Sequence, residues 1–148
     1  MSRRINRELT IYNDFFNQEN IQLIEYEQET NIIKLVMIIR DRVLFVNLNF
    51  PKEYPFQPPQ VLIYKDGVKH NYLDLLYLNK EWYDYFNLKG CFCCNSILCK
   101  WSIPNNIKEV IEEIQKNLEY KLRIREIITC RSLVNQKIGT YVPIEIFL

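Results

Sequence analysis

The stretch NFPKEYPFQPPQVLIY, residues 49–64, holds four prolines within the nine residues from Pro51 to Pro59. Proline fixes the backbone angle φ and removes a hydrogen-bond donor, so we expect a rigid, extended connection here. The segment that follows, QVLIYK at 60–65, predicts a strand. Taken alone, the stretch is equally compatible with an ordinary proline-stiffened loop.

Three further strand-like segments precede the prolines, at residues 21–29, 31–40 and 42–50. Short turns, ETN and RDR, separate them. Together with residues 60–65 they predict a four-stranded antiparallel meander. The alternation is clearest in the third segment, which places Leu44, Val46, Leu48 and Phe50 on one side and Val43, Phe45, Asn47 and Asn49 on the other.

Amphipathic patterns on either side of the strands predict two helices. The first spans residues 2–16 and the second about 102–122, capped by Asn105 or Asn106. The rest of the chain predicts a further helix and then a short strand. The apolar faces comprise Ile5, Leu9, Tyr12 and Phe16 in the first helix and Ile107, Val110, Ile111, Ile114 and Leu118 in the second.

The order of these elements predicts one α+β domain over residues 1–148, with helices on one face or at one end of the sheet. Apolar residues make up 48% and charged residues 25%, as in globular proteins. Alanine is absent and only three glycines occur, a bias that suggests an AT-rich genome such as that of a large DNA virus or a parasite.

The net charge of +1 gives no long-range field that would draw the protein to nucleic acid or an anionic membrane. No apolar run reaches the ~18 residues of a membrane span, and no apolar run follows the basic N-terminus as in a secretory signal. We therefore expect no nucleic-acid or membrane partner. The expected compartment is reducing, where disulfides are rare.

Four of the five cysteines lie in GCFCCNSILCKWSIP, residues 90–104. Neighbours such as Cys93 and Cys94 are poorly placed to pair with one another, so a disulfide knot is disfavoured. A zinc site is a second alternative, with ligands drawn from the five cysteines and His70, but the paired knuckles of such sites are missing. A reactive thiol and small buried residues are the remaining alternatives.

These motifs resemble those of the ubiquitin-conjugating enzymes. FPKEYPFQPPQV is similar to the family signature F-P-x-x-Y-P-F-x-P-P-x-V, and GCFCCNSILCKWS resembles G-x-I-C-L-D-I-L-x-x-x-W-S-P. Cys93 alone fits both ends of the second register, with Gly90 three residues before it and Trp101 and Ser102 eight and nine after it. SIPNNIKEVIEEIQKNL is similar to the family's central helix. The resemblance covers residues 2–120 and leaves 121–148 as a divergent tail.

The resemblance implies a UBC-like α+β fold: an N-terminal helix, a four-stranded antiparallel meander, an active-site loop with an insertion, and a central helix. Cys93 would carry ubiquitin or a similar modifier as a thioester, without cofactor or metal. His70 and Asn71 would match the family's His-Pro-Asn motif with the proline deleted. His70 would then be structural and Asn71 the oxyanion donor.

Several departures from the family pattern qualify this correspondence. Asn71 stands twenty-two residues before Cys93, where the family has eight, so residues 72–89 carry an insertion. The insertion offers Asn79 and Asn87 as rival oxyanion donors. The family's G-P-x-x-T-x-Y-x-G-G-x-F hairpin is missing. A non-catalytic UBC-like module that binds ubiquitin or acts as a scaffold is therefore the alternative function.

Partner surfaces follow from the same resemblance. A ubiquitin ligase would contact Phe56 and the loop Ser102, Ile103 and Pro104, although Phe56 could equally be a core residue. Arg3, Arg4 and Arg7 would meet the activating enzyme, although a solvated helix face explains them as well. The remaining partners would be the modifier and a substrate protein. We expect a cytoplasmic monomer, in the host cytoplasm or nucleus if the protein is viral.

Overall fold

The computed structural model describes residues 2–78, 80–86 and 91–139. Within them the fold is α+β, as predicted, and its sheet is antiparallel with its strands in chain order. The strands are β1 (Asn17–Gln18), β2 (Ile21–Glu27), β3 (Ile32–Ile39), β4 (Arg42–Asn49), β5 (Gln60–Lys65) and β6 (Val68–Asn71). The helices are α1 (Ser2–Ile11), α2 (Tyr72–Leu75), α3 (Lys80–Tyr85), α4 (Phe92–Asn95) and α5 (Ile107–Ile138).

The expected sheet of four strands is wrong, because the described residues form six. The short β1 precedes β2, and β6 pairs with β5. Asp66 and Gly67 form the turn between β5 and β6, with φ of 52° and 77°. Asp-Gly supplies the positive φ angles of a tight hairpin, so this strand pair carried a recognisable sequence signal.

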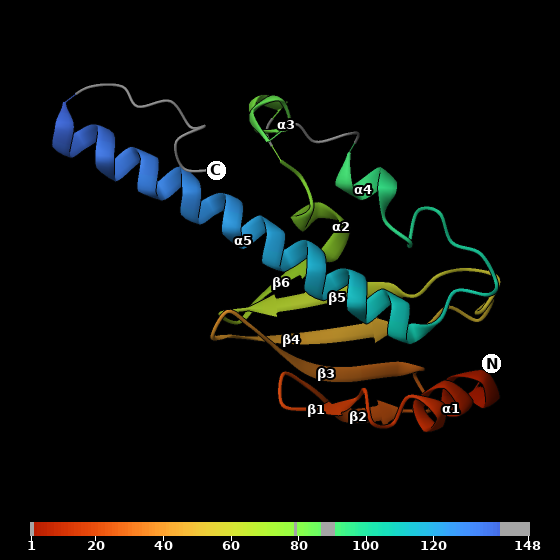
Figure 1. Cartoon of the computed structure of the whole chain (residues 1–148). Helices are drawn as coiled ribbons and strands as arrows, with labels where there is room; N and C mark the ends of the chain where they lie inside the picture. Colours follow the sequence, from red (N-terminus) through yellow and green to blue (C-terminus); the bar gives the residue numbers. More distant parts are fainter. Residues whose placement is uncertain (1, 79, 87–90, 140–148) are drawn as a thin grey trace.

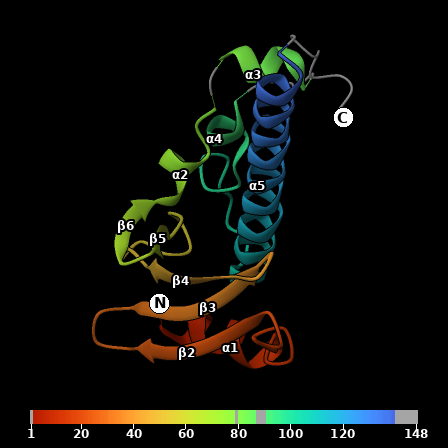
Figure 2. The same cartoon turned by 90° about the vertical axis from the view of Figure 1, so that its left-hand side faces the viewer.

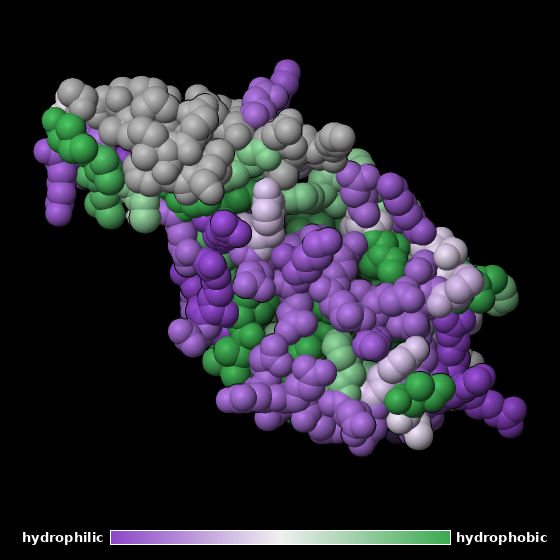
Figure 3. All heavy atoms as spheres, viewed as in Figure 1, coloured by the Kyte–Doolittle hydropathy of each residue, from purple (hydrophilic) through white to green (hydrophobic). Residues whose placement is uncertain are grey.

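The core lies between the sheet and α5, which crosses one face of the sheet (Figure 1). The alternation predicted for residues 42–50 is confirmed, because Leu44, Val46 and Leu48 are buried while Val43 and Phe45 are exposed. The stripe predicted for the central helix is also buried in full. Polar residues predominate on the outward side of the first half of α5 (Figure 3). The helices α2, α3 and α4 lie along one side of α5 (Figure 2).

The central helix is much longer than predicted. Asn106 caps it, its side chain accepting a hydrogen bond from the Glu109 N–H at 3.0 Å. The helix continues through the expected break near residue 121 and ends at Gly139, whose φ of 72° is the left-handed conformation of a helix C-cap. The expected terminal strand falls within residues 140–148, outside the described residues. No described helix is long and apolar enough to cross a membrane.

The proline stretch forms successive turns instead of the extended connection we expected. The N–H groups of Tyr54 and Phe56 donate to the carbonyls of Pro51 and Glu53, at 3.1 and 2.6 Å, and the Tyr54–Pro55 peptide bond is cis. Tyr54 is buried, whereas Phe56 is 73% exposed. The turns thus direct one aromatic ring into the core and the next into solvent, which excludes the core role for Phe56.

Glu8 on α1 connects three separate parts of the chain. It is only 6% exposed, and its carboxylate accepts hydrogen bonds from the Tyr54 hydroxyl at 2.6 Å and from the Ile107 N–H at 3.0 Å. Burial raises the pKa of Tyr54, and the adjacent Glu8 carboxylate raises it further, so the tyrosine stays neutral and donates. Glu8 therefore holds the proline turns and the start of α5 against α1.

We predict that Glu8→Ala lowers the free energy of unfolding by about 3 kcal/mol, because it leaves the buried Tyr54 hydroxyl and the Ile107 N–H unsatisfied. Urea unfolding followed by circular dichroism measures the change. Glu19→Ala, which removes an exposed carboxylate, is the matched control and should stay within about 0.5 kcal/mol of the parent. Equal effects of the two substitutions would contradict the role given to Glu8.

Candidate active site

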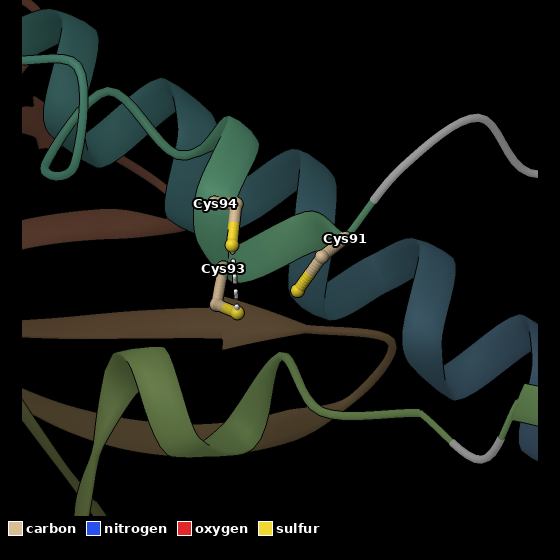
Figure 4. A group of neighbouring side chains, drawn as sticks. All are labelled: Cys91, Cys93 and Cys94. Atoms are coloured by element: carbon tan, nitrogen blue, oxygen red, sulfur yellow. Dashed lines mark hydrogen bonds between the residues drawn. The ribbon is translucent and has the colours of Figure 1, made fainter.

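Three cysteines converge at α4. Cys91 is the N-cap residue of this helix, and Cys93 and Cys94 lie within it. Their sulfur atoms all lie within 4.8 Å of one another, and those of Cys93 and Cys94 are 4.0 Å apart (Figure 4). Cys91 and Cys93 are half-buried, Cys94 is exposed, and all five cysteines of the chain are free thiols. The structure thus joins three thiols in one accessible cluster.

A single carboxylate on α5, that of Glu113, holds the segment after α4. It accepts hydrogen bonds from the Ser96 hydroxyl at 2.8 Å, the Ile97 N–H at 2.7 Å and the Tyr72 hydroxyl at 2.9 Å. Ser96 is only 1% exposed. The thiol segment and the start of the insertion are therefore fixed to the same point on α5. No local pattern in the sequence singled out Glu113, Ser96 or Tyr72.

Trp101 connects the thiol segment to the proline turns. Its indole N–H donates to the Pro55 carbonyl at 2.8 Å, and its ring lies 6.0 Å from that of Tyr54. Phe56 and Ile103, exposed by 73% and 48%, follow on the two sides of this contact. The structure thus brings together two stretches that are 46 residues apart in sequence. All four predicted ligase contacts, Phe56, Ser102, Ile103 and Pro104, are exposed.

The predicted basic docking face is divided. Arg3 and Arg7 are exposed on α1, whereas the guanidinium group of Arg4 donates to the carbonyls of Ile103 and Asn105 at 2.7 and 2.6 Å. Arg4 also lies over the Tyr54 ring, 5.4 Å from its centroid. Arg4 is therefore a structural link between α1 and the loop after Trp101, while Arg3 and Arg7 remain available to a partner.

The insertion packs beside the thiols as two short helices, α2 and α3. The ring of Tyr83 lies 6.3 Å from that of Phe92, which packs edge-on against Tyr120 of α5 at 5.6 Å. Burial raises the pKa of Tyr83, with the Phe92 backbone acting in the opposite sense and the neighbouring Cys91 raising it further. The insertion therefore covers the Cys91 side of the cluster and leaves Cys94 exposed.

The thiols differ in their affinity for protons. Hydrogen bonds from the Cys93 thiol and from the backbone N–H of Cys94 lower the pKa of Cys91 to about 7, although Cys91 forms no cap hydrogen bond of ordinary geometry. The same bond to Cys91, together with burial, raises the pKa of Cys93 to about 11. The two thiols therefore titrate together near neutral pH, and Cys91 is the favoured position for the negative charge.

The two residues matched to the His-Pro-Asn motif occupy different settings. Asn71 is the N-cap of α2, and its side-chain oxygen accepts a hydrogen bond from the Leu73 N–H at 3.1 Å. His70 pairs with Ile63 in the sheet and lines a cavity under α5 whose lining includes none of the cysteines. The rival donors Asn79 and Asn87, and Gly90 of the motif register, lie outside the described residues.

The cluster also bears on metal binding. Thiolates prefer thiophilic ions such as Zn²⁺ or Cu⁺. Within the described part of the chain, Cys91, Cys93 and Cys94 are the residues whose potential ligand atoms gather in this way. Cys99, Cys130 and His70, named as further zinc ligands from the sequence, do not join them. The arrangement offers three sulfur ligands without the fourth that a structural zinc site requires.

No protein-family model matches the chain. A search of curated proteins likewise finds no match.

We predict that alkylation with iodoacetamide at pH 8 modifies Cys91 ahead of Cys93, because only the thiolate reacts. In Cys91→Ser the negative neighbour is lost, so the pKa of Cys93 falls and its alkylation accelerates about tenfold for each pKa unit. Peptide mass spectrometry measures both rates. Cys99→Ser, outside the cluster, is the control and should change neither. A Cys93 rate that is unaffected by Cys91→Ser would disprove the coupling.

Proposed function

We propose that this protein is a UBC-like conjugating enzyme that carries ubiquitin or a related modifier as a thioester on Cys93. The observation that carries the proposal is the hydrogen bond from Trp101 to Pro55. It joins the two stretches that resemble the family, because Trp101 of the cysteine segment donates to Pro55, the residue before exposed Phe56. The six-stranded α+β architecture is compatible with this assignment.

The chemistry follows from the properties of sulfur. The Cys93 sulfur attacks the carbonyl carbon of the modifier's C-terminal thioester on the activating enzyme, forming a new thioester and releasing the enzyme's thiolate. A lysine amine, or a ligase thiol, then attacks the same carbon and expels the Cys93 thiolate. Since Cys91 is ionised beside the protonated Cys93, Cys91 is the base that accepts the Cys93 proton during the first attack.

Positioning groups complete the proposed mechanism. The side-chain oxygen of Asn71 accepts a hydrogen bond from the Leu73 N–H at the start of α2, and this bond orients the side chain. The amide N–H₂ group of Asn71 is then left to stabilise the oxyanion of each tetrahedral intermediate. His70 has a structural role in the sheet. Phe56, with Ser102, Ile103 and Pro104, forms the ligase surface, and Arg3 and Arg7 contact the activating enzyme. Exposed aromatic and apolar anchors of this kind suit such interfaces.

Two observations favour the alternative function, a non-catalytic module that binds ubiquitin or acts as a scaffold. Cys93 holds its proton at neutral pH, and the insertion packs against Phe92, its immediate neighbour. Both features lower the reactivity of the thiol. The family-like register of Cys93 with Trp101, together with the neighbouring base Cys91, favours catalysis.

We predict that the protein incubated with activating enzyme, ATP and ubiquitin gains a band of added ubiquitin mass that thiol reductants remove. Cys93→Ser converts this band to a reductant-resistant ester or abolishes it, because an oxygen ester does not exchange with thiols. Cys99→Ser and Cys130→Ser are controls and should load normally. Absence of the band in the parent protein would favour the non-catalytic module, and its loss only in Cys91→Ser would move the nucleophile to Cys91.

We predict that Asn71→Ala and Asn71→Asp both slow discharge to free lysine by about 10²–10³-fold while loading changes less, because each removes one oxyanion donor. Asp retains the oxygen that caps α2, so Asn71→Asp separates the donor from the cap. Single-turnover discharge, followed on gels, measures the effect. Normal discharge by Asn71→Asp would show that Asn71 acts as a helix cap alone.

A further inference from the structure

A cavity remote from the thiols lies between α5 and the end of the sheet that bears the β3–β4 and β5–β6 turns. Its volume is about 120 Å³, several times the ~15 Å³ that one water molecule needs. Leucine and isoleucine side chains from the sheet, α2 and α5 form much of its wall. The remaining lining residues are Arg42, Lys65, His70, Lys121 and Arg125.

The charge of this lining is one-sided. Four permanently or normally cationic side chains and the chain's single histidine face the cavity, and no acidic side chain among the described residues lines it. The cations come from β4, β5 and two successive turns of α5. They are brought together by the fold, since they do not lie in one stretch of the sequence. A concave site lined by one sign of charge concentrates counter-ions.

These cations lack the partners that other basic residues of the protein have. Lys34 pairs with Glu27 at 2.6 Å, and Arg40 pairs with Glu126. Arg42, Lys65 and Arg125 form no ion pair within the described residues, and Lys121 donates to a neutral group, the Leu75 carbonyl. The cavity therefore retains unneutralised positive charge beside an apolar wall.

The mutual repulsion is visible in the two lysines. Burial lowers the pKa of Lys65, and the charges of Arg125 and Arg42 lower it further, with Asp66 acting in the opposite sense. Burial also lowers the pKa of Lys121, as do Arg125 and Lys65. Groups that destabilise one another's charged forms in this way are stabilised together when an anion enters between them.

We propose that this cavity is a binding site for a small phosphate-bearing anion, held by Arg42, Lys65, Lys121 and Arg125. Arginine side chains match the oxygens of a phosphoryl group in pairs, and lysine adds a compact charge. The volume of about 120 Å³ suits one or two phosphoryl groups and is too small for a folded partner. The proposal does not depend on the conjugating function.

Thermal unfolding of the full chain tests the site, with inorganic phosphate and pyrophosphate as probes against sodium chloride of equal ionic strength. We expect pyrophosphate at a hundredfold excess over its dissociation constant to raise Tm by about 5–10 °C. Phosphate should raise Tm less at equal concentration, because it carries less charge. Isothermal titration should give one anion per chain.

Lys65→Gln supplies the decisive variant, and Arg125→Gln repeats the test if that variant folds poorly. Each should abolish the pyrophosphate shift and, without anion, raise Tm by about 1–2 °C, because one repelling charge is gone. Lys69→Gln removes the same charge from the neighbouring strand position, outside the cavity, and should keep the shift. Absence of a shift in the parent would show that the cavity does not bind the anion and would overturn the proposal. Equal shifts in Lys65→Gln and Lys69→Gln would mean an adventitious ion only and would overturn it as well.

Discussion

The placement of the thiols depends on one carboxylate, that of Glu113. It receives three hydrogen bonds from two segments that are otherwise separate, the residues after α4 and the first residue of α2. Carboxylates accept such bonds strongly in partly buried settings, and each donor fixes its segment relative to a rigid helix. Glu8 does the same at the first residue of α5, where it holds the proline turns and the beginning of that helix. The loops around the cysteines are thus fastened to helices at both ends.

The three anchored cysteines have the same side chain but differ in protonation and exposure. Cys91 carries the negative charge near neutrality, Cys93 retains a proton and packs against the core, and Cys94 faces solvent. A nucleophile that stays protonated until a neighbouring base accepts the proton is protected from indiscriminate oxidants, which attack thiolates. The exposed Cys94 and the half-buried, ionised Cys91 would then meet such reagents first. Low resting reactivity is therefore expected of Cys93 alone among the three thiols.

Much of the fold could be predicted from local patterns. The alternation in residues 42–50 and the stripe from Ile107 to Leu118 reported their buried faces correctly, since period and burial are directly linked. The strand β6 was missed because its residues were assigned to a loop motif, even though Asp66-Gly67 signalled a hairpin. A further helix was predicted in the tail, but its continuity with the central helix as one α5 was not. Contacts such as Glu113 with Ser96, or the gathering of Lys65 and Arg125, join residues far apart in sequence and leave no local pattern.

The length of α5 has a structural consequence. Its 32 residues extend about 48 Å, and its buried side chains, except Ile124, belong to the first twelve residues, up to Leu118. The distal half is a rigid helical extension. An ion pair between its Glu126 and Arg40 connects it to the β3–β4 turn. Tyr120, where this extension begins, packs edge-on against the ring of Phe92, and the ring of Phe92 in turn lies beside that of Tyr83. Residues of α5 that lie beyond its buried stripe are therefore joined, through Tyr120, to the aromatic rings beside the cysteine segment.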